Sequence, residues 1–316
     1  MSSIGGYLGW EFPLGNEYHD RLLRLNTGRN AFEYILRTTR YSKVYLPYYC
    51  CDALLEPVRK TGIDYVFYHI DSQLDPVIDF EINDGECFLY VNYFGVKNDT
   101  VAKLAGEVRN LVIDNSQSFF SRPMPGIGTF YSCRKFFGVP NGAYVYLNTY
   151  EPHNLPADTS YDSCTHLLKY VDCGIEAAYG DFLANEQHLA GQEIKQMARL
   201  THAMMNVAPY SFSCERRNDN FQYLHERLSE INELKLNFSS VNGPLHYPLL
   251  VPDSGLRKLL IGEKIFVAEY WPAVRTWAGK DTYEHYLTEH LLALPIDQRY
   301  ERRDMDRIAE SIFKFH

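Results

Sequence analysis

The sequence predicts an α/β protein with a mainly parallel central sheet covered by helices and a smaller C-terminal α/β domain. Helix-like and strand-like segments alternate along the first half of the chain, which is the pattern of repeated βαβ units. A length of 316 residues is enough for one large domain and a second, smaller one. The hydrophobic share of 46% is that of a globular protein with a buried core.

The first 150 residues supply most of the predicted sheet. Residues 29–40 carry apolar side chains at helical spacing, after a Thr-Gly pair that suits a helix start. A strand over 43–46 stops at Pro47, and the short apolar runs that follow alternate with further helical segments. The predicted helices are 29–40, 51–61 and 101–109, and the predicted strands are 43–46, 65–69, 87–92, 111–114, 129–131 and 142–147.

The character of the sequence changes after Tyr150. Long helical stretches follow from 164 to about 207, and then Pro209 and a polar run over 211–220 indicate a boundary. We therefore expect a large domain over 1–208 and a small domain over 209–316. The small domain is predicted to contain a helix ending near 234, strands at 247–251 and 264–268, and a last helix over 304–313.

Composition excludes several classes of protein. A net charge of −9 and a pI near 5.7 argue against a general nucleic-acid surface, which needs a basic stripe. Seven cysteines without paired spacing indicate reduced thiols, so we expect no disulfide and no metal site. The amino terminus lacks the features of a signal peptide, and no apolar run is long enough to span a membrane. These observations predict a cytoplasmic protein.

The stretch 111–147 contains the residues with the clearest chemistry. An apolar strand ends at Asp114, at the sheet edge where open α/β folds bind ligands, and Lys135 follows about twenty residues later between two strand-like runs. A neutral lysine amine can form a Schiff base with an aldehyde. A carboxylate beside a pyridine nitrogen keeps that nitrogen protonated. The pair therefore suits a pyridoxal phosphate enzyme, although Asp114 as a helix cap and Lys135 as a solvated cation are the alternatives.

The order of motifs along most of the chain resembles the DegT/DnrJ/StrS family of sugar aminotransferases. This family has the aspartate aminotransferase fold, which is fold type I of the pyridoxal phosphate enzymes. No single motif is specific, but their order and spacing together are. The matching segments are Asn26–Ala31, Val44–Asp52, Tyr90–Gly95, Asp114 with Gln117, Ser132 with Lys135, and Leu292–Tyr300.

The resemblance implies a role for each residue that would contact the cofactor ring. Asp114 matches the acid that pairs with the pyridine nitrogen, and Gln117 matches the residue that binds the ring hydroxyl. Lys135 matches the Schiff-base lysine, which also acts as general base. Tyr49 is our choice for the aromatic residue that stacks on the ring. The family position of that aromatic falls at Cys51, so a core role for Tyr49 is the alternative.

The resemblance also implies a phosphate site at the start of the first long helix. A helix N-terminus offers unpaired N–H groups to an anion, and Gly28, Arg29 and Asn30 form this turn. An ordinary capped helix start is the alternative. Ser132 matches the family serine that binds the same phosphate. Only two residues separate it from Lys135, whereas many members of the family have a longer gap.

The implied function is a pyridoxal phosphate aminotransferase that acts on a nucleotide-linked keto sugar, with glutamate as amino donor, in amino-sugar and glycan biosynthesis. Such enzymes are usually homodimers. Arg216, Arg217 and Arg275 are candidate contacts for anionic groups. One alternative is a non-transaminating enzyme with the same cofactor. Sugar dehydratases of this kind have histidine in place of the lysine, so Lys135 argues against them. The other is a shortened binding protein without catalysis.

Overall fold

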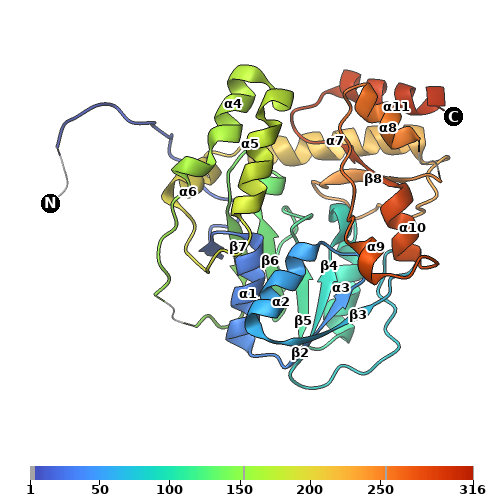
Figure 1. Cartoon of the computed structure of the whole chain (residues 1–316), viewed down its shortest axis with the longest axis horizontal. Helices are drawn as coiled ribbons and strands as arrows, with labels where there is room; N and C mark the ends of the chain where they lie inside the picture. Colours follow the sequence, from blue (N-terminus) through green and yellow to red (C-terminus); the bar gives the residue numbers. More distant parts are fainter. Residues whose placement is uncertain (1–3, 152–153, 253–254, 316) are drawn as a thin grey trace.

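A seven-stranded sheet forms the centre of the molecule in the computed structural model, which describes residues 4–151, 154–252 and 255–315. Figure 1 shows the sheet with helices around it and the two termini at opposite ends of the long axis. The sheet runs in the order β1 (Leu23–Leu25), β7 (Ala143–Tyr146), β6 (Gly128–Ser132), β5 (Leu111–Asp114), β4 (Glu86–Val91), β2 (Lys43–Pro47) and β3 (Asp64–Tyr68).

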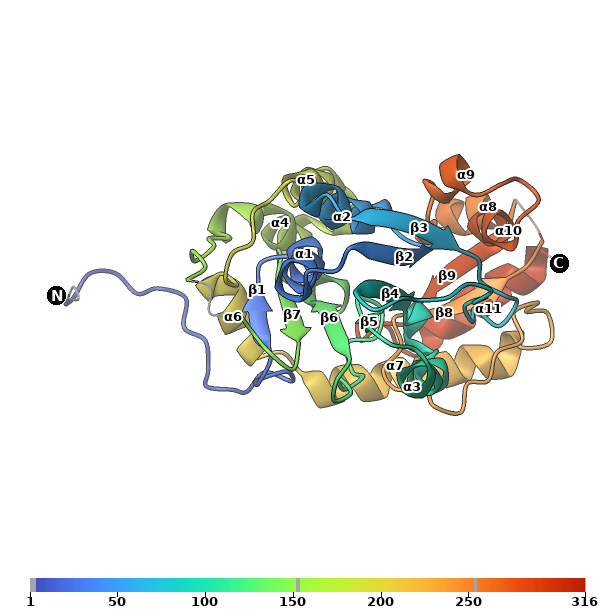
Figure 2. The ribbon, with the colours of Figure 1, turned by 90° about the horizontal axis from the view of Figure 1, so that it is seen from below.

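The strands pair in a mainly parallel manner, as the alternation of elements predicts. Strands β3, β2, β4, β5 and β6 are joined by parallel pairings, and β7 runs antiparallel to both of its neighbours. Every position of β4, β5 and β6 is buried. Strands that are covered by helices on both faces have this unbroken apolar character. Figure 2 shows α1 and α2 on one face of the sheet and α3 and α7 on the other.

The helix at the start of the cofactor motif begins as its sequence predicts. The Thr27 side chain caps it by accepting a hydrogen bond from the Asn30 N–H at 3.1 Å. The helices of the described residues are α1 (Gly28–Thr39), α2 (Leu55–Thr61), α3 (Asn98–Glu107), α4 (Thr165–Cys173), α5 (Ile175–His188), α6 (Arg199–Asn206), α7 (Tyr210–Leu228), α8 (Leu256–Gly262), α9 (Val274–Trp277), α10 (Tyr283–His290) and α11 (Arg302–Phe315).

The carboxyl-terminal part packs beside the sheet as a smaller α/β unit. Its two strands, β8 (His246–Leu250) and β9 (Leu291–Pro295), pair antiparallel and lie among α7, α8, α10 and α11. The division of the chain at residue 208 stays a prediction. Within the described residues, no helix is both long and apolar enough to cross a membrane.

The helix predicted to end near 234 is α7, which ends at Leu228, and one predicted strand was wrong. The predicted strand over 264–268 makes only a single bridge, between Ala268 and Ala293, so β9 rather than this segment pairs with β8. The helical stretches predicted from 164 to about 207 are α4, α5 and α6. Gly174, with φ of +84°, separates the first two, because this backbone conformation favours glycine and ends a helix.

Candidate functional site

Asp114 and Lys135 meet at one edge of the sheet because their strands are parallel neighbours. Asp114 is the last residue of β5 and pairs in register with Phe130 of β6. Lys135 ends the short 3-10 turn that directly follows β6. The carboxyl ends of these strands therefore deliver both side chains to the same place, as the sequence predicts for a ligand site of an open α/β sheet.

The Asp114 carboxyl is buried and electrostatically coupled to the lysine. Only 7% of Asp114 is exposed, and its Oδ1 accepts a hydrogen bond from the Ser116 N–H at 2.7 Å. Burial raises the pKa of Asp114, while the nearby charge of Lys135 lowers it without cancelling the effect of burial. A cation placed against this carboxyl would stabilise its charged form, as the predicted pairing with a protonated ring nitrogen requires.

Gly28, the first residue of α1, closes a cradle of hydroxyl groups. A Cβ atom at Gly28 would lie 3.6 Å from Ser132 Cβ and 3.9 Å from both Ser132 Oγ and Ser116 Oγ. The N-terminus of α1 and two serine hydroxyls therefore converge, which is a combination of donors suited to a phosphate. Ser116 was missed by the sequence analysis, although it stands between Asp114 and Gln117 and was within reach of the same motif.

Two arginines add positive charge beside this cradle. Burial lowers the pKa of Arg134 to about 10, and the neighbouring charge of Arg29 contributes to the decrease. Arg134 forms an ion pair with Glu186, and Arg29 Nε lies 3.4 Å from Glu56 Oε2 without making a hydrogen bond. Arg29 therefore lies near the start of α1, as predicted, and its Nε–H group has no hydrogen-bond partner.

The Asn30 side chain is engaged in hydrogen bonds within the protein. Its Nδ2 group donates to Gln192 O at 2.7 Å and to Glu33 Oε2 at 3.2 Å, and its Oδ1 accepts from the Thr27 hydroxyl at 2.7 Å. These bonds use both amide hydrogens within the protein. The side chain therefore fixes the start of α1 and the segment around Gln192, and does not face the cradle as a free donor.

The side-chain amide of Gln117 has one hydrogen-bonded atom and one atom without a partner. Its Oε1 accepts a hydrogen bond from the Phe94 N–H at 2.6 Å, while its Nε2 is buried without a partner. Buried donors are almost always paired, so this amide indicates an acceptor that the protein itself does not supply. Gly95, with φ of +77°, keeps the neighbouring turn close, because a Cβ there would lie 2.7 Å from Gln117 O.

Tyr49 lies in the core, which is the alternative role that the sequence analysis gives for it. Its ring packs edge-on against Trp271 at 4.9 Å, and its hydroxyl donates to Tyr270 O at 3.0 Å, with no part of the residue exposed. Cys51 is the residue of this segment that lies near the lysine: burial raises the pKa of its thiol, and the charge of Lys135 opposes that change. The family position of the aromatic residue is therefore filled by a thiol.

His246 is a member of the site that the sequence analysis missed. It is the first residue of β8, and its Nδ1 is buried without a hydrogen-bond partner. Burial lowers the pKa of His246 from 6.5 to about 3, and the charges of Arg217 and, to a smaller extent, Lys135 add to this. The sequence around His246 gives no sign of a site, because His246 and Lys135 are more than one hundred positions apart in the chain. Only the folding of the small C-terminal unit brings them together.

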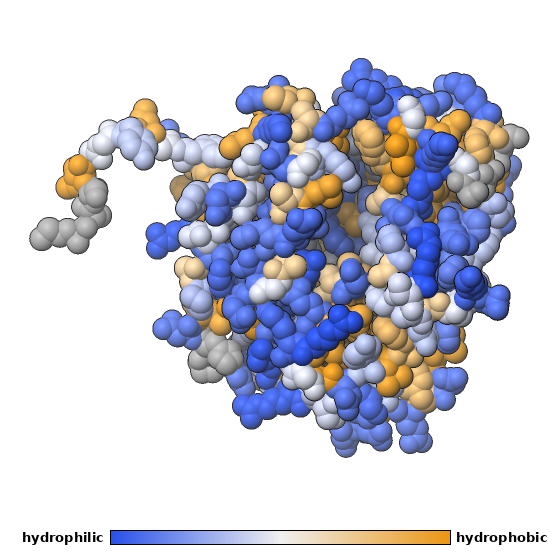
Figure 3. All heavy atoms as spheres, viewed as in Figure 1, coloured by the Kyte–Doolittle hydropathy of each residue, from blue (hydrophilic) through white to orange (hydrophobic). Residues whose placement is uncertain are grey.

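Lys135 also lines a cavity of about 410 Å³ between α5 and the segment 297–299. Figure 3 shows a hollow on this side of the molecule, between α4–α5 and the C-terminal elements. Most of the wall is apolar, and charged groups lie along one side. The aromatic lining residues are Phe136, Phe137, Tyr170, Tyr179 and Phe182, and the charged ones besides Lys135 are Arg134, Arg217, Asp297 and Arg299.

The three arginines predicted as anion contacts are all engaged within the protein. Arg217 is 2% exposed and donates to Pro244 O and Leu245 O, each at 3.1 Å. Arg216 donates to Tyr300 O at 3.2 Å, and Arg275 forms an ion pair with Glu269. Arg217 therefore holds two segments of the chain together beside the cavity.

Comparison with known proteins yields structural relatives only. No protein-family profile and no curated protein sequence matches the chain. A DegT DnrJ EryC1 StrS aminotransferase from Brucella abortus aligns over 93% of this chain and 86% of its own, with 16% identity and a TM-score of 0.63. The sugar aminotransferase CalS13 from Micromonospora echinospora aligns over 93% and 87%, with 16% identity and a TM-score of 0.64.

A third structure shows that the same fold also carries another reaction. The E. coli GDP-4-keto-6-deoxy-D-mannose-3-dehydratase, solved with bound hydrated PLP, aligns over 92% of this chain and 86% of its own, with 14% identity and a TM-score of 0.64. At these identities the comparisons establish the fold. They confirm the predicted fold class: the chain has the type I fold of the pyridoxal phosphate-dependent DegT/DnrJ/EryC1/StrS sugar aminotransferases.

Proposed function

We propose that this chain is a pyridoxal phosphate-dependent aminotransferase that acts on a nucleotide-linked keto sugar, with glutamate as the amino donor, in amino-sugar biosynthesis in the cytoplasm. The observation that carries the proposal is the meeting of Lys135 with the buried Asp114 carboxyl. The fold supports it, because two of the structural relatives are described as an aminotransferase and a sugar aminotransferase.

The residues around this pair fit the cofactor. The unpaired Gln117 Nε2 is a donor suited to the ring hydroxyl, and Asp114 is an acid suited to the ring nitrogen. The start of α1 at Gly28, with the hydroxyls of Ser132 and Ser116, forms a cradle suited to the phosphate. When bound, pyridoxal phosphate supplies an electron-withdrawing ring that stabilises negative charge on a carbon next to nitrogen.

The chain's own residues then divide the work among themselves. Lys135 Nζ would hold the cofactor and, as a neutral amine, would accept and return the proton that moves during amino transfer. Asp114 keeps the ring nitrogen protonated through its charge. His246 contributes a neutral imidazole, because its pKa of about 3 leaves it uncharged at neutral pH. The aromatic residues of the Lys135 cavity give the lysine apolar surroundings on one side.

Apolar side chains at the surface support a homodimer. Leu8, Trp10 and Leu14 of the N-terminal arm are exposed, as are Val171 and Tyr179 of the α4–α5 hairpin. The arm extends away from the body of the molecule (Figure 1). A second copy of the chain could bury the apolar groups of the arm and of the hairpin. Sedimentation velocity at micromolar concentration tests the dimer directly.

The function is tested first by absorbance. Titration of the purified protein with pyridoxal phosphate should produce the visible band of the lysine-bound cofactor, and Lys135→Ala should abolish it. Lys103→Ala, which removes an exposed lysine of α3, is the matched control and should keep the band. A wild-type protein without the band, or a band that survives in Lys135→Ala, would contradict the proposal.

The reaction is tested next with substrates. The cofactor-loaded protein should release 2-oxoglutarate from L-glutamate when it is supplied with a panel of nucleotide-linked keto sugars. Loss of a hydroxyl group from the sugar without transfer of nitrogen would instead identify a dehydratase. Cofactor binding without any turnover on the panel would favour the alternative of a binding protein.

A further inference from the structure

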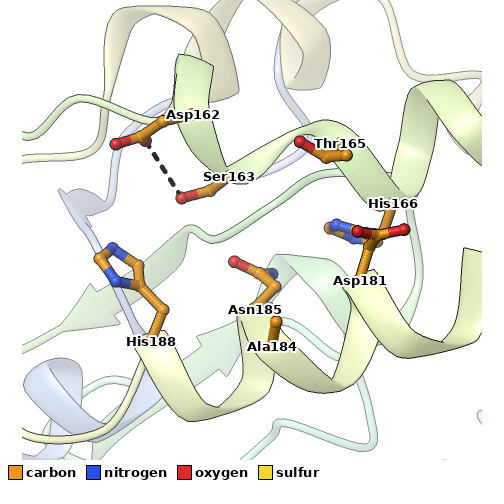
Figure 4. A pocket seen from close by; sticks show the side chains of 8 residues that line it. All are labelled: Asp162, Ser163, Thr165, His166, Asp181, Ala184, Asn185 and His188. Carbon is orange, nitrogen blue, oxygen red and sulfur yellow. Dashed lines mark hydrogen bonds between the residues drawn. The ribbon is translucent and has the colours of Figure 1, made fainter.

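A second cavity, of about 200 Å³, lies between α4 and α5 and has no part in the proposed function. Figure 4 shows its polar side chains projecting from α5 and from the facing segment around the start of α4. One wall is shared with the Lys135 cavity, because His166 lines both. The lining residues are Asp162, Ser163, Thr165, His166, Asp181, Ala184, Asn185 and His188.

Asn185 brings an unpaired acceptor to this cavity. The residue is only 5% exposed, and its Nδ2 donates to Pro140 O at 2.9 Å, which fixes the orientation of the amide. Its Oδ1 is buried and has no hydrogen-bond partner. In Figure 4 this oxygen points toward the side of the cavity formed by Ser163 and His188. A buried acceptor of this kind indicates a ligand that donates a hydrogen bond.

The other lining groups narrow the chemistry of that ligand. Asp181 is paired with Lys169 Nζ at 2.8 Å, so the carboxylate of Asp162 is the lining group that would repel an anionic ligand. Burial lowers the pKa of His166, as does the charge of Arg134, so its ring is neutral at physiological pH. The Thr165 hydroxyl can donate and accept, whereas the Ser163 hydroxyl donates to Asp162 Oδ1 at 3.3 Å and can still accept. A mixture of acceptors and hydroxyls matches hydroxyl groups of a ligand, whereas an ammonium group can only donate.

The size of the cavity agrees with this chemistry. A volume of 200 Å³ corresponds to roughly six or seven water molecules at about 30 Å³ each. This is room for a small ring with several hydroxyl substituents. We infer that the cavity between α4 and α5 binds a neutral polyol, in the form of a monosaccharide ring.

The ring has two possible sources, a free sugar or an outer sugar unit of a larger molecule. The shared wall at His166 places the polyol site beside the Lys135 cavity. Pro140, which accepts the hydrogen bond from Asn185, lies on the loop that follows the lysine. Both sources present the same hydroxyl chemistry to Asn185 Oδ1, so the test includes one probe for each.

The inference is tested by binding, independently of any turnover. Calorimetric titration of the full chain with D-glucose, D-galactose and D-mannose should show saturable binding of at least one sugar, with or without pyridoxal phosphate. Asn185→Leu removes the unpaired acceptor and should weaken binding about tenfold. Asp162→Ala, at an exposed position, should weaken it about threefold to fivefold and keeps the inference testable if Asn185→Leu fails to fold.

Asp172→Ala removes an exposed aspartate of α4 outside the cavity and should bind like the wild type. Absence of saturable binding of all three sugars would overturn the inference, as would equal affinities in Asp162→Ala, Asp172→Ala and wild type. UDP-glucose separates the two sources. If Asp162→Ala weakens the binding of UDP-glucose by the same factor as that of the free sugar, the site binds a linked sugar unit. If the affinity for UDP-glucose is unchanged, the site binds a free sugar. Because cofactor absorbance is a separate measurement, either proposal can fail without the other.

Discussion

Asp114 and Lys135 lie close enough for the charge of one to change the ionisation of the other: burial raises the pKa of the Asp114 carboxyl, and the lysine lowers it. The local sequence around either residue does not place the two side chains together. Parallel pairing of β5 with β6 brings the two strand ends together. This arrangement allows a prediction for the removal of the Asp114 charge.

Asp114→Asn should reduce kcat about 100-fold, since the neutral amide cannot keep the ring nitrogen of the cofactor protonated. The fold should be retained, because the remaining carbonyl oxygen can accept the Ser116 N–H bond. Steady-state kinetics of the cofactor-loaded protein measures the effect. Asp79→Asn, at an exposed position, is the control, and comparable losses in both variants would argue against the assigned role.

Gln117→Glu should weaken pyridoxal phosphate binding about tenfold or more. The variant keeps an oxygen for the Phe94 N–H and replaces the unpaired Nε2 donor with a second acceptor. Equilibrium titration followed by absorbance gives the dissociation constant. The exposed substitution Gln73→Glu should leave that constant unchanged. An unaltered affinity in Gln117→Glu would show that this amide does not face the cofactor.

Gly28→Ala should lower affinity for phosphate-bearing ligands roughly tenfold while leaving the thermal midpoint unchanged or slightly raised. The added methyl group would be in ordinary van der Waals contact with Ser132 and near Ser116 Oγ, so the fold tolerates it, but the cradle becomes smaller. Competition of inorganic phosphate with the cofactor measures the loss. Gly106→Ala, in α3 with open space around it, gains about 1 kcal/mol of helix stability at most and should not affect phosphate.

His246 should make the protein less stable in acid. Its pKa falls from 6.5 to about 3 on folding, so the unfolded chain binds the proton more readily. The stability that the neutral ring contributes is complete above pH 6.5 and is lost as the pH falls from 6.5 toward 3, by up to about 1.4 kcal/mol per pH unit.

His246→Gln should therefore flatten the dependence of the free energy of unfolding on pH over that window. Urea denaturation at pH 7, 6, 5 and 4 compares the slopes. His19 contributes in the same direction in both proteins, because burial lowers its pKa to about 4. The exposed substitution His188→Gln should keep the wild-type slope, and a variant at 246 with that same slope would disprove the assignment.

Arg217→Met should lower the free energy of unfolding by about 3 kcal/mol, because it leaves the carbonyl groups of Pro244 and Leu245 without their buried donor. Its neighbour Arg216 offers a matched control, since Arg216→Met removes one hydrogen bond to Tyr300 O and should cost less than about 1 kcal/mol. Chemical denaturation measures both values. Similar losses of unfolding free energy in the two variants would indicate that the burial of Arg217 does not add to its contribution to stability.

Much of the fold was readable from local pattern. The unbroken apolar runs of β4 and β5 identified buried parallel strands, and Thr27 with Gly28 marked the start of α1. The strand over 264–268 was wrong because a short apolar run does not reveal its pairing partner, and β9 takes that place. Pairing is a long-range property, so short strands of the C-terminal unit were the weakest predictions.

The candidate site, like the fold, was predictable from the sequence only in part. Asp114 and Lys135 were proposed from the strand pattern, and Gln117 and Ser132 were implied by the resemblance to the sugar aminotransferases. The structure places Tyr49 in the core and Cys51 near the lysine, and the local sequence of this segment does not show which of its residues faces the core.

The sequence by itself determined the strands and helices from α1 to β7, the acid and the lysine, and the turn at the start of α1. Only the tertiary structure decided that His246 and Cys51 share the space around Lys135, that Asn30 and Arg217 serve the scaffold, and that Asn185 Oδ1 is left without a partner. The physical reason is that hydrophobic periodicity acts over a few residues, whereas burial, charge coupling and unpaired donors or acceptors depend on segments that meet only after folding.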